Sequence, residues 1–239
     1  MPTNLQSLKQ QVLEANIALG KAGLVLLTWG NVSGRDKETG LVVIKPSGVD
    51  YDALRLEHMV VVDPSDGRVV EGGLRPSSDT PTHLVLYRQF PGVGGVAHSH
   101  STYATAWAQA RAPLACMGTT HADHFRGTVP VTDEMTETEI GGSYEAETGN
   151  VIVRVFQTTN CDPLEVPGVL VAGHGPFTWG ASPSKAVENG VVLEQVARMN
   201  LLSLQIAEAT GPISDYLRDR HFYRKHGPGA YYGQVSTAE

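Results

Sequence analysis

Cysteine, positive charge and long apolar runs are scarce in this chain of 239 residues. Its 2 cysteines, Cys116 and Cys161, form no CxxC unit and no disulfide framework, so a reducing, cytoplasmic setting is expected. The 18 Lys and Arg residues against 25 Asp and Glu residues leave a net charge of −7, which argues against nucleic-acid binding. No apolar run approaches the roughly 20 residues that span a bilayer, and the first residues, Met1-Pro-Thr-Asn4, do not resemble a signal peptide.

The length of the chain is typical of one large domain, which we expect to span residues 1–239. No repeat, low-complexity tract or charge block indicates a second one. Because several connections between the expected strands are too short for helical crossovers, we predict an α/β fold with a central, mostly antiparallel or mixed sheet flanked by helices.

Hydrophobic periodicity predicts the individual elements. Apolar residues from Leu5 to Ile17 follow the helical period, and Gly20 and Gly23 favour the end of that helix. Further helices are expected over 81–90, 101–111 and 183–209. Short β-branched or apolar runs predict strands over 24–27, 41–44, 59–62, 93–98, 113–117, 151–157 and 169–172.

Two histidines at a spacing of two, His98 and His100, close the apolar run 93–97. In a strand such residues point to the same face, and neutral imidazole is a preferred zinc ligand. His-x-His alone is more often structural, but His174 closes a second apolar run between two glycines, and Asp79 stands at a helix start just before Pro81. These four residues predict a metal site.

A second group of segments is polar and rich in glycine, proline and serine: 28–31, 45–48 and 76–78. Each adjoins an expected strand or helix, where free backbone N–H groups and hydroxyls can hold an oxyanion such as a phosphate. Taken singly, each is more often an ordinary turn. Lys45 beside Ser47 and Gly48 stands above that background and favours a phosphorylated small molecule. No Walker A motif or dinucleotide fingerprint is present.

Taken together and in order, a series of motifs between about Leu5 and Gln234 resembles the L-ribulose-5-phosphate 4-epimerases of the class II aldolase and epimerase superfamily. The motifs are Thr28-Trp-Gly-Asn31, Lys45-Pro-Ser-Gly-Val-Asp-Tyr51, Pro76-Ser-Ser-Asp-Thr-Pro-Thr-His83, His98-Ser-His100, Gly118-Thr-Thr-His-Ala-Asp123, Gly149-Asn-Val-Ile152, His174-Gly-Pro-Phe177 and Tyr231-Tyr-Gly-Gln234.

The resemblance implies a soluble Zn²⁺ enzyme, with Mn²⁺ or Co²⁺ as possible substitutes, that acts on a phosphorylated ketopentose. It implies a homotetramer with active sites at subunit interfaces. Asp123 and Tyr232 look like the acid/base pair, and Tyr232 and His221 are expected to reach the site from a neighbouring subunit. The implied metal ligands are Asp79, His98, His100 and His174. The implied phosphate-binding residues are Asn31, Lys45, Ser47, Gly48, Ser77 and Ser78, with Thr119 from the adjoining subunit.

The implied reaction converts L-ribulose 5-phosphate into D-xylulose 5-phosphate. Direct deprotonation at C4 is unfavourable because that hydrogen is β to the ketone and is not acidic. Retro-aldol cleavage of the C3–C4 bond, rotation of the aldehyde and re-addition avoid this problem and need no redox cofactor. Acid/base groups on two faces of the substrate would move the protons.

Three other functions are weighed against this reading. A class II aldolase would release the aldehyde, but related fuculose-phosphate aldolases carry Glu at the position of Asp79 and lack the arrangement around Asp123. A metallohydrolase is disfavoured because 101–103 supplies no further ligand for a His-x-His-x-Asp cluster. A non-catalytic scaffold, like the aldolase-like head of the adducins, is disfavoured by the full set of candidate site residues.

Overall fold

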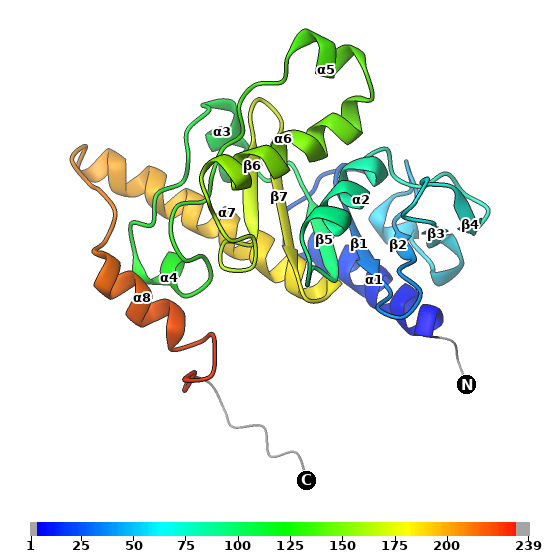
Figure 1. The fold of residues 1–239 in the computed structure, drawn as a ribbon, viewed down its shortest axis with the longest axis horizontal. Helices are drawn as coiled ribbons and strands as arrows, with labels where there is room; N and C mark the ends of the chain where they lie inside the picture. The colour runs from blue at the N-terminus through cyan, green and yellow to red at the C-terminus, as the bar shows by residue number, and fades with distance from the viewer. Residues whose placement is uncertain (1–3, 233–239) are drawn as a thin grey trace.

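The computed structural model describes residues 4–232 and contains a single sheet of seven strands in the order β4-β3-β2-β1-β5-β7-β6 (Figure 1). The strands are β1 (Asn31–Arg35), β2 (Val42–Ile44), β3 (Val60–Val62), β4 (Val69–Glu71), β5 (Gly95–His98), β6 (Gly168–Val171) and β7 (Gly175–Gly180). Within the described residues, neighbouring strands all pair antiparallel. The predicted mostly antiparallel sheet is therefore confirmed.

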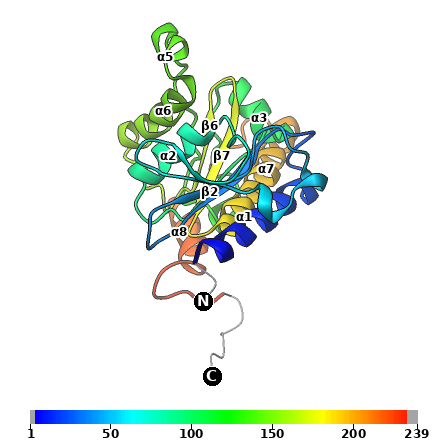
Figure 2. The ribbon, with the colours of Figure 1, turned by 90° about the vertical axis from the view of Figure 1, so that its right-hand side faces the viewer.

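Helices cover both faces of this sheet (Figure 2). On one face lie α1 (Asn4–Lys21), α3 (Thr102–Gln109) and α7 (Pro183–Ile206); on the other lie α2 (Thr80–Gln89) and α6 (Tyr144–Thr158). Successive strand residues supply both layers: Val42 and Ile44 belong to the core beneath α2, whereas Val43 packs with Leu8 and Val12 of α1.

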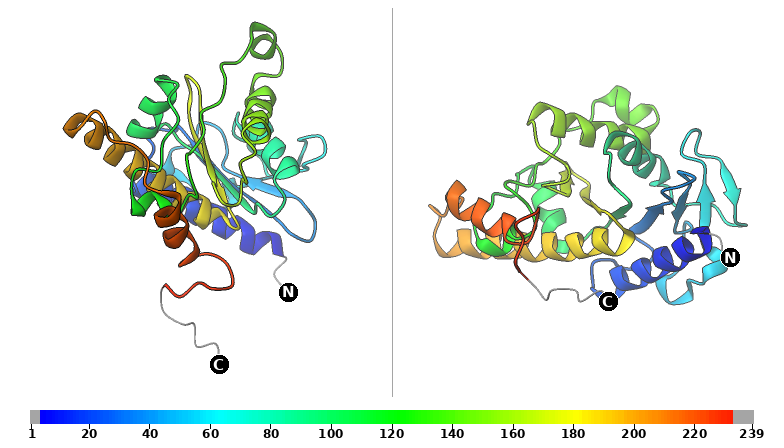
Figure 3. Two further views of the ribbon diagram at one scale, coloured as in Figure 1. Left: turned by 60° about the vertical axis from the view of Figure 1, so that its left-hand side comes forward. Right: turned by 60° about the horizontal axis from the view of Figure 1, so that its bottom comes forward.

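Three short helices lie outside these layers. Helix α4 (Thr119–Ala122) packs against α8 (Asp215–Tyr223) at the end of the molecule opposite β3 and β4, and α5 (Glu137–Gly141) projects beyond α6 (Figures 1 and 3). Two single 3-10 turns, η1 (Tyr51–Ala53) and η2 (Leu56–His58), connect β2 to β3. No helix in the range 4–232 has the length and apolar character that crossing a membrane requires.

Several element predictions were wrong. Segment 24–27 is a loop in which Leu26 and Leu27 are exposed and Leu27 has a φ of 53°, so its apolar run does not mark a strand. Segment 151–157 lies within α6, because its buried residues Val151, Ile152 and Phe156 follow the helical period. Segment 113–117 forms only an isolated bridge from Leu114 to Val129.

Three strands were not predicted: β1, β4 and β7. The sequence of β1, Asn-Val-Ser-Gly-Arg, is too polar to suggest a strand, although the structure buries four of its five residues. Expected elements that the structure contains include the opening helix, the strands over 41–44 and 59–62, and the helix over 81–90. The long C-terminal helix ends at Ile206 rather than at residue 209.

Candidate metal centre and active site

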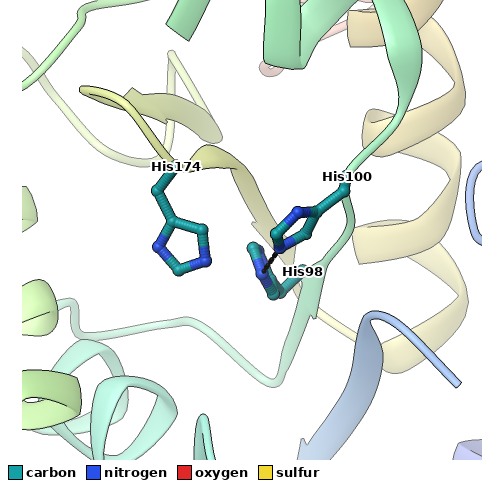
Figure 4. Close-up of side chains that lie close together, drawn as sticks. All are labelled: His98, His100 and His174. Atoms are coloured by element: carbon teal, nitrogen blue, oxygen red, sulfur yellow. Dashed lines mark hydrogen bonds between the residues drawn. The ribbon is translucent and has the colours of Figure 1, made fainter. Parts of the chain in front are cut away.

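Three imidazoles meet where β5 and β7 lie side by side (Figure 4). His98 is the last residue of β5, His100 follows it, and His174 occupies the turn that leads into β7. One ring nitrogen of each lies within 4.8 Å of the others. The antiparallel pairing of His98 with Phe177 brings the turn that carries His174 next to the His-x-His segment.

The orientation of His98 favours metal binding. Its buried ring stacks on Phe177 with the centroids 4.1 Å apart, and its Nδ1 lies 2.9 Å from the carbonyl oxygen of Pro176. Because a carbonyl only accepts, Nδ1 carries the proton and Nε2 presents a lone pair toward His100 Nε2, 3.1 Å away. Burial lowers the pKa of His98 to about 3, which keeps the ring neutral, the form that binds a cation. Three neutral imidazoles at this spacing fit a divalent transition metal.

Asp79 lies beside the three histidines, at the N-cap of α2. Its Oδ2 accepts a hydrogen bond of 2.6 Å from the Asn31 amide, which also donates to the Ser77 hydroxyl at 2.9 Å. Asp79 is not one of the groups within 4.8 Å of one another. Asn31 therefore fixes the carboxylate at the edge of the histidine cluster and connects it to the start of α2.

A cavity of about 490 Å³ joins this cluster to the polar segments predicted from the sequence. It is lined by all of the residues expected to bind metal, and by Asn31, Lys45, Ser47, Gly48, Ser77 and Ser78. Lys45 is 1% exposed, and burial lowers the pKa of its ammonium group while Asp50 opposes that shift. Among the described residues no carboxylate forms an ion pair with Lys45, so its charge faces the cavity without an acidic partner.

Four other predicted residues form a separate group at α4 and α8. The Asp123 carboxylate accepts hydrogen bonds from Arg224 at 2.9 and 2.6 Å and lies 3.0 Å from Nδ1 of His221. Burial raises the pKa of Asp123, but the bonds from Arg224 and His221 outweigh it and hold the pKa below the usual range. Tyr232 lies over the Arg224 guanidinium at 4.9 Å, and Thr119 begins α4.

The structure therefore divides the predicted site into two parts. We call the cavity residues the metal half and the group of Thr119, Asp123, His221 and Tyr232 the acid/base half. No residue of the acid/base half lines the cavity, and α4 and α8 lie far along the molecule from β1, β2 and α2 (Figures 1 and 3). The resemblance implied that Thr119, His221 and Tyr232 come from a neighbouring subunit, but it did not imply this for Asp123.

Arg224 and Lys225 were missed by the sequence analysis. Both contact Asp123, with Lys225 Nζ 3.4 Å from Oδ2. Their spacing of three and four residues from His221 places all three on one side of the helix end, and this spacing is the signal that could have identified them. Trp29 and Thr28 were quoted only as parts of a motif, yet both line the cavity, and the Trp29 ring lies 6.2 Å from that of His100.

Comparison with known proteins identifies the family and the fold. Residues 10–201 match the family model of the class II aldolase and adducin N-terminal domain. The chain belongs to this family. Its class II aldolase fold is also seen in solved structures: L-fuculose 1-phosphate aldolase superposes with a TM-score of 0.77 at 25% identity, covering 91% of this chain and 95% of that one. L-fuculose 1-phosphate aldolase from Glaciozyma antarctica PI12 gives 0.75 at 20% identity, covering 96% and 87%.

Curated relatives share a higher sequence identity with this chain than these solved structures do. The chain is 55% identical over 230 residues to L-ribulose-5-phosphate 4-epimerase UlaF of Salmonella typhi, covering 96% of this chain and 100% of that protein. The same identity and coverage hold for the protein of that name from Salmonella choleraesuis (strain SC-B67). The resemblance found in the sequence motifs is therefore confirmed over nearly the whole chain.

Proposed function

We propose that this protein converts L-ribulose 5-phosphate into D-xylulose 5-phosphate by cleaving and re-forming the C3–C4 bond. The observation that carries the proposal is one cavity that joins three neutral imidazoles and Asp79 to the buried ammonium of Lys45. A sugar phosphate would place its sugar oxygens at the histidine end of that cavity and its phosphate at the Lys45 end. The relatives named L-ribulose-5-phosphate 4-epimerase support the choice of reaction within the class II aldolase family.

The metal half would hold Zn²⁺ on His98, His100 and His174, with Asp79 as a further ligand or close partner, and the same donors accept Mn²⁺ or Co²⁺. When bound, the ion supplies Lewis-acid stabilisation of the negative charge that develops on substrate oxygens during C–C cleavage. The hydrogen bond from His98 to Pro176 holds that ring in the ligating tautomer before any ion arrives.

The other end of the cavity would bind the phosphate. Lys45 provides the charge, and Ser47, Ser77 and Ser78 provide hydroxyl donors around it. Gly48 has a φ of 68°, a conformation that suits glycine and that opens its backbone to an anion. Anchored by its phosphate, the aldehyde fragment stays in the site while it rotates, which favours re-addition over release.

The acid/base half would move the protons. On cleavage the C4 hydroxyl loses a proton as its carbon becomes an aldehyde, and on re-addition to the other face the C4 oxygen takes a proton back. Asp123 and Tyr232 would serve the two faces. Arg224 and His221 keep Asp123 ionised and oriented between turnovers.

Two copies of the chain are needed to bring these halves together, so the proposal includes a homotetramer with active sites at its interfaces. The separation of α4 and α8 from β1, β2 and α2, which carry or adjoin cavity-lining residues, supports this arrangement (Figure 1). Because Asp123 contacts His221 of its own chain, a partner that supplies His221 also supplies Asp123. A cytoplasmic location is part of the proposal, since Cys116 and Cys161 are both free thiols.

The test is to incubate the metal-loaded protein with L-ribulose 5-phosphate and to follow D-xylulose 5-phosphate through a coupled assay while also assaying free dihydroxyacetone. Formation of xylulose phosphate with little free dihydroxyacetone is expected. Dihydroxyacetone as the main product would identify an aldolase instead. Absence of turnover in the metal-loaded protein would refute the substrate assignment and favour the scaffold function.

A further inference from the structure

Tyr51 contacts Lys45 and the Trp29-Gly30 turn, which both line the cavity, yet Tyr51 itself does not line it. It opens η1, shortly after the Lys45-Pro-Ser-Gly48 segment. Its ring lies beneath the ammonium of Lys45, with Nζ 4.9 Å from the ring centroid. Its hydroxyl lies 2.8 Å from the carbonyl oxygen of Gly30 and 3.0 Å from that of Trp29, and donates to this pair.

The contact with the Tyr51 ring stabilises the buried charge of Lys45 without a carboxylate partner. A buried ammonium needs a stabilising partner, but a carboxylate in that place would compete with phosphate for the charge. The negative face of an aromatic ring stabilises the cation and leaves its donors free. The ammonium's hydrogen-bond acceptor among the described residues is its neighbour, the Pro46 carbonyl oxygen, at 3.3 Å.

The hydroxyl of Tyr51 holds a different part of the cavity lining, the turn at Gly30. Gly30 has a φ of 78°, and a Cβ there would lie 2.6 Å from the carbonyl oxygen of His98, so the turn packs directly on the metal-bearing strand. Asn31, which follows it, binds both Asp79 and Ser77. Burial raises the pKa of Tyr51, and Asp79 adds to the shift, so the phenol stays protonated as a donor.

The position of the ring is itself fixed. It packs against Gly20 near the end of α1, where a Cβ would lie 3.5 Å from Cγ of Tyr51, and it joins the apolar cluster around Leu8 and Val12. The core of the protein therefore holds Tyr51 in place, and Tyr51 in turn holds two parts of the site.

We propose that Tyr51 is a positioning residue for phosphate binding, whose ring holds the Lys45 ammonium toward the cavity while its hydroxyl fixes the Trp29-Gly30 turn that carries Asn31. This inference deepens the proposed function and rests on its phosphate-binding site. Tyr51 touches no substrate atom, so it acts through Lys45 and Asn31.

The experiment compares Tyr51→Leu, which removes the ring together with its hydroxyl, with Tyr51→Phe, which removes the hydroxyl alone, so that the difference between the two variants reports the ring. Affinity for inorganic phosphate is measured by calorimetry on the metal-loaded protein, and KM and kcat are measured with L-ribulose 5-phosphate. Loss of a cation–π contact of ordinary strength weakens phosphate binding about tenfold in Tyr51→Leu. We expect KM to rise by a similar factor with a smaller change in kcat, and we expect Tyr51→Phe to keep most of the phosphate affinity.

A double-mutant cycle separates this role from a merely structural one. In a Lys45→Met background no ammonium is left to position, so Tyr51→Leu should lower phosphate affinity no further than Tyr51→Phe does, whereas a general loss of structure in Tyr51→Leu would add to the effect of Lys45→Met. Tyr87→Phe is the matched control for Tyr51→Phe, because it removes the hydroxyl of another tyrosine, which is buried and hydrogen-bonded to the Ser33 hydroxyl at 2.8 Å. It should leave phosphate affinity unchanged. Tyr51→Met serves as a second ringless variant where Tyr51→Leu does not fold.

Unchanged phosphate affinity in a folded, metal-loaded ringless variant would overturn the inference, as would additive losses in the cycle. These outcomes are distinct from failure of the proposed function, because phosphate calorimetry requires no turnover. A wild-type protein whose phosphate affinity depends on Lys45 and Tyr51 but which does not epimerise would refute the reaction while supporting the positioning role of Tyr51.

Discussion

Two inactive variants should regain activity when they assemble into one oligomer, provided that one variant is damaged in the metal half and the other in the acid/base half. His98→Asn removes an imidazole whose Nε2 points at the centre of the histidine cluster, and should therefore lose the metal and the activity. Asp123→Asn removes the carboxylate bound by Arg224 and His221, and should keep the metal and the fold while losing turnover. In a mixed oligomer, the intact cavity of one copy can meet the intact acid/base half of another.

The size of the recovery follows from the separation of the halves. If each site takes its metal half from one subunit and its acid/base half from the next, random assembly of equal amounts makes about one quarter of the sites fully intact. Recovered activity should therefore reach about a quarter of the wild-type rate per site, and should fall on either side of the equal mixture.

The assay co-expresses the two variants in varied ratios, measures the composition of the oligomers by native mass spectrometry, and follows D-xylulose 5-phosphate formation. Metal content is measured in the same samples. The structure also supplies a control mixture, Asp123→Asn with His221→Asn. These residues contact each other within one chain, so both variants damage the same half and no mixture of them should recover.

Absence of activity at every ratio of His98→Asn to Asp123→Asn, in oligomers shown to contain both chains, would refute the shared site. Recovery in the Asp123→Asn and His221→Asn mixture would instead show that these two residues serve different sites, against the contact seen here.

Two further predictions concern stability. Burial lowers the pKa of His121 to about 4, against an ordinary value near 6.5. Between these two pH values the imidazole is protonated in the unfolded chain but neutral in the folded one. The free energy of unfolding therefore decreases as the pH falls from 6.5 toward 4. Measured by urea unfolding, the contribution of this group should be up to about 1.4 kcal/mol per pH unit, the value for one proton. His121→Gln keeps a donor toward the Gly127 carbonyl oxygen but cannot take up the proton, so it should reduce the slope by that amount. An unchanged slope would contradict the assignment to His121. In α6, a Cβ at Gly149 would lie 2.6 Å from Cβ of Val85, so Gly149→Ala should destabilise the protein by about 1–2 kcal/mol, the cost of overpacking less the gain in helix propensity. The same change in a Val85→Gly background, which removes that Cβ, should cost much less, and an equal loss in both backgrounds would show that the close approach does not set the cost.

Local pattern was enough to predict much of the metal half. The spacing of His98 and His100 has a direct consequence in a strand, and Asp79 before Pro81 marks the start of a helix, so these predictions depend on a few consecutive residues. Among the polar segments, composition set only the one around Lys45 apart from an ordinary turn, and Ser77 was implied by the family resemblance. The structure brings all of these residues to one cavity.

Packing across the sheet could not be predicted in the same way. Strand β1 is stabilised by distant partners: Ser33 bonds to His83 and Tyr87 of α2, and a Cβ at Gly34 would meet Leu8 and Pro183 at 2.8 Å. None of these contacts leaves a signal in the sequence of the strand itself. Conversely, the β-branched residues near Val151 favour a strand locally, but the helix that contains them buries the same side chains against α2.

The sequence by itself indicated the candidate metal ligands through the spacing of their residues, and its resemblance to a known family implied the phosphate-binding and acid/base residues. Only the tertiary structure decided how they are grouped. Asp79 and Asp123 both lie at the end of a helix, yet Asp79 lines the cavity whereas Asp123 is bound by Arg224 at the far end of the molecule. That separation arises from the path of the chain across the sheet, a long-range property that no local pattern contains.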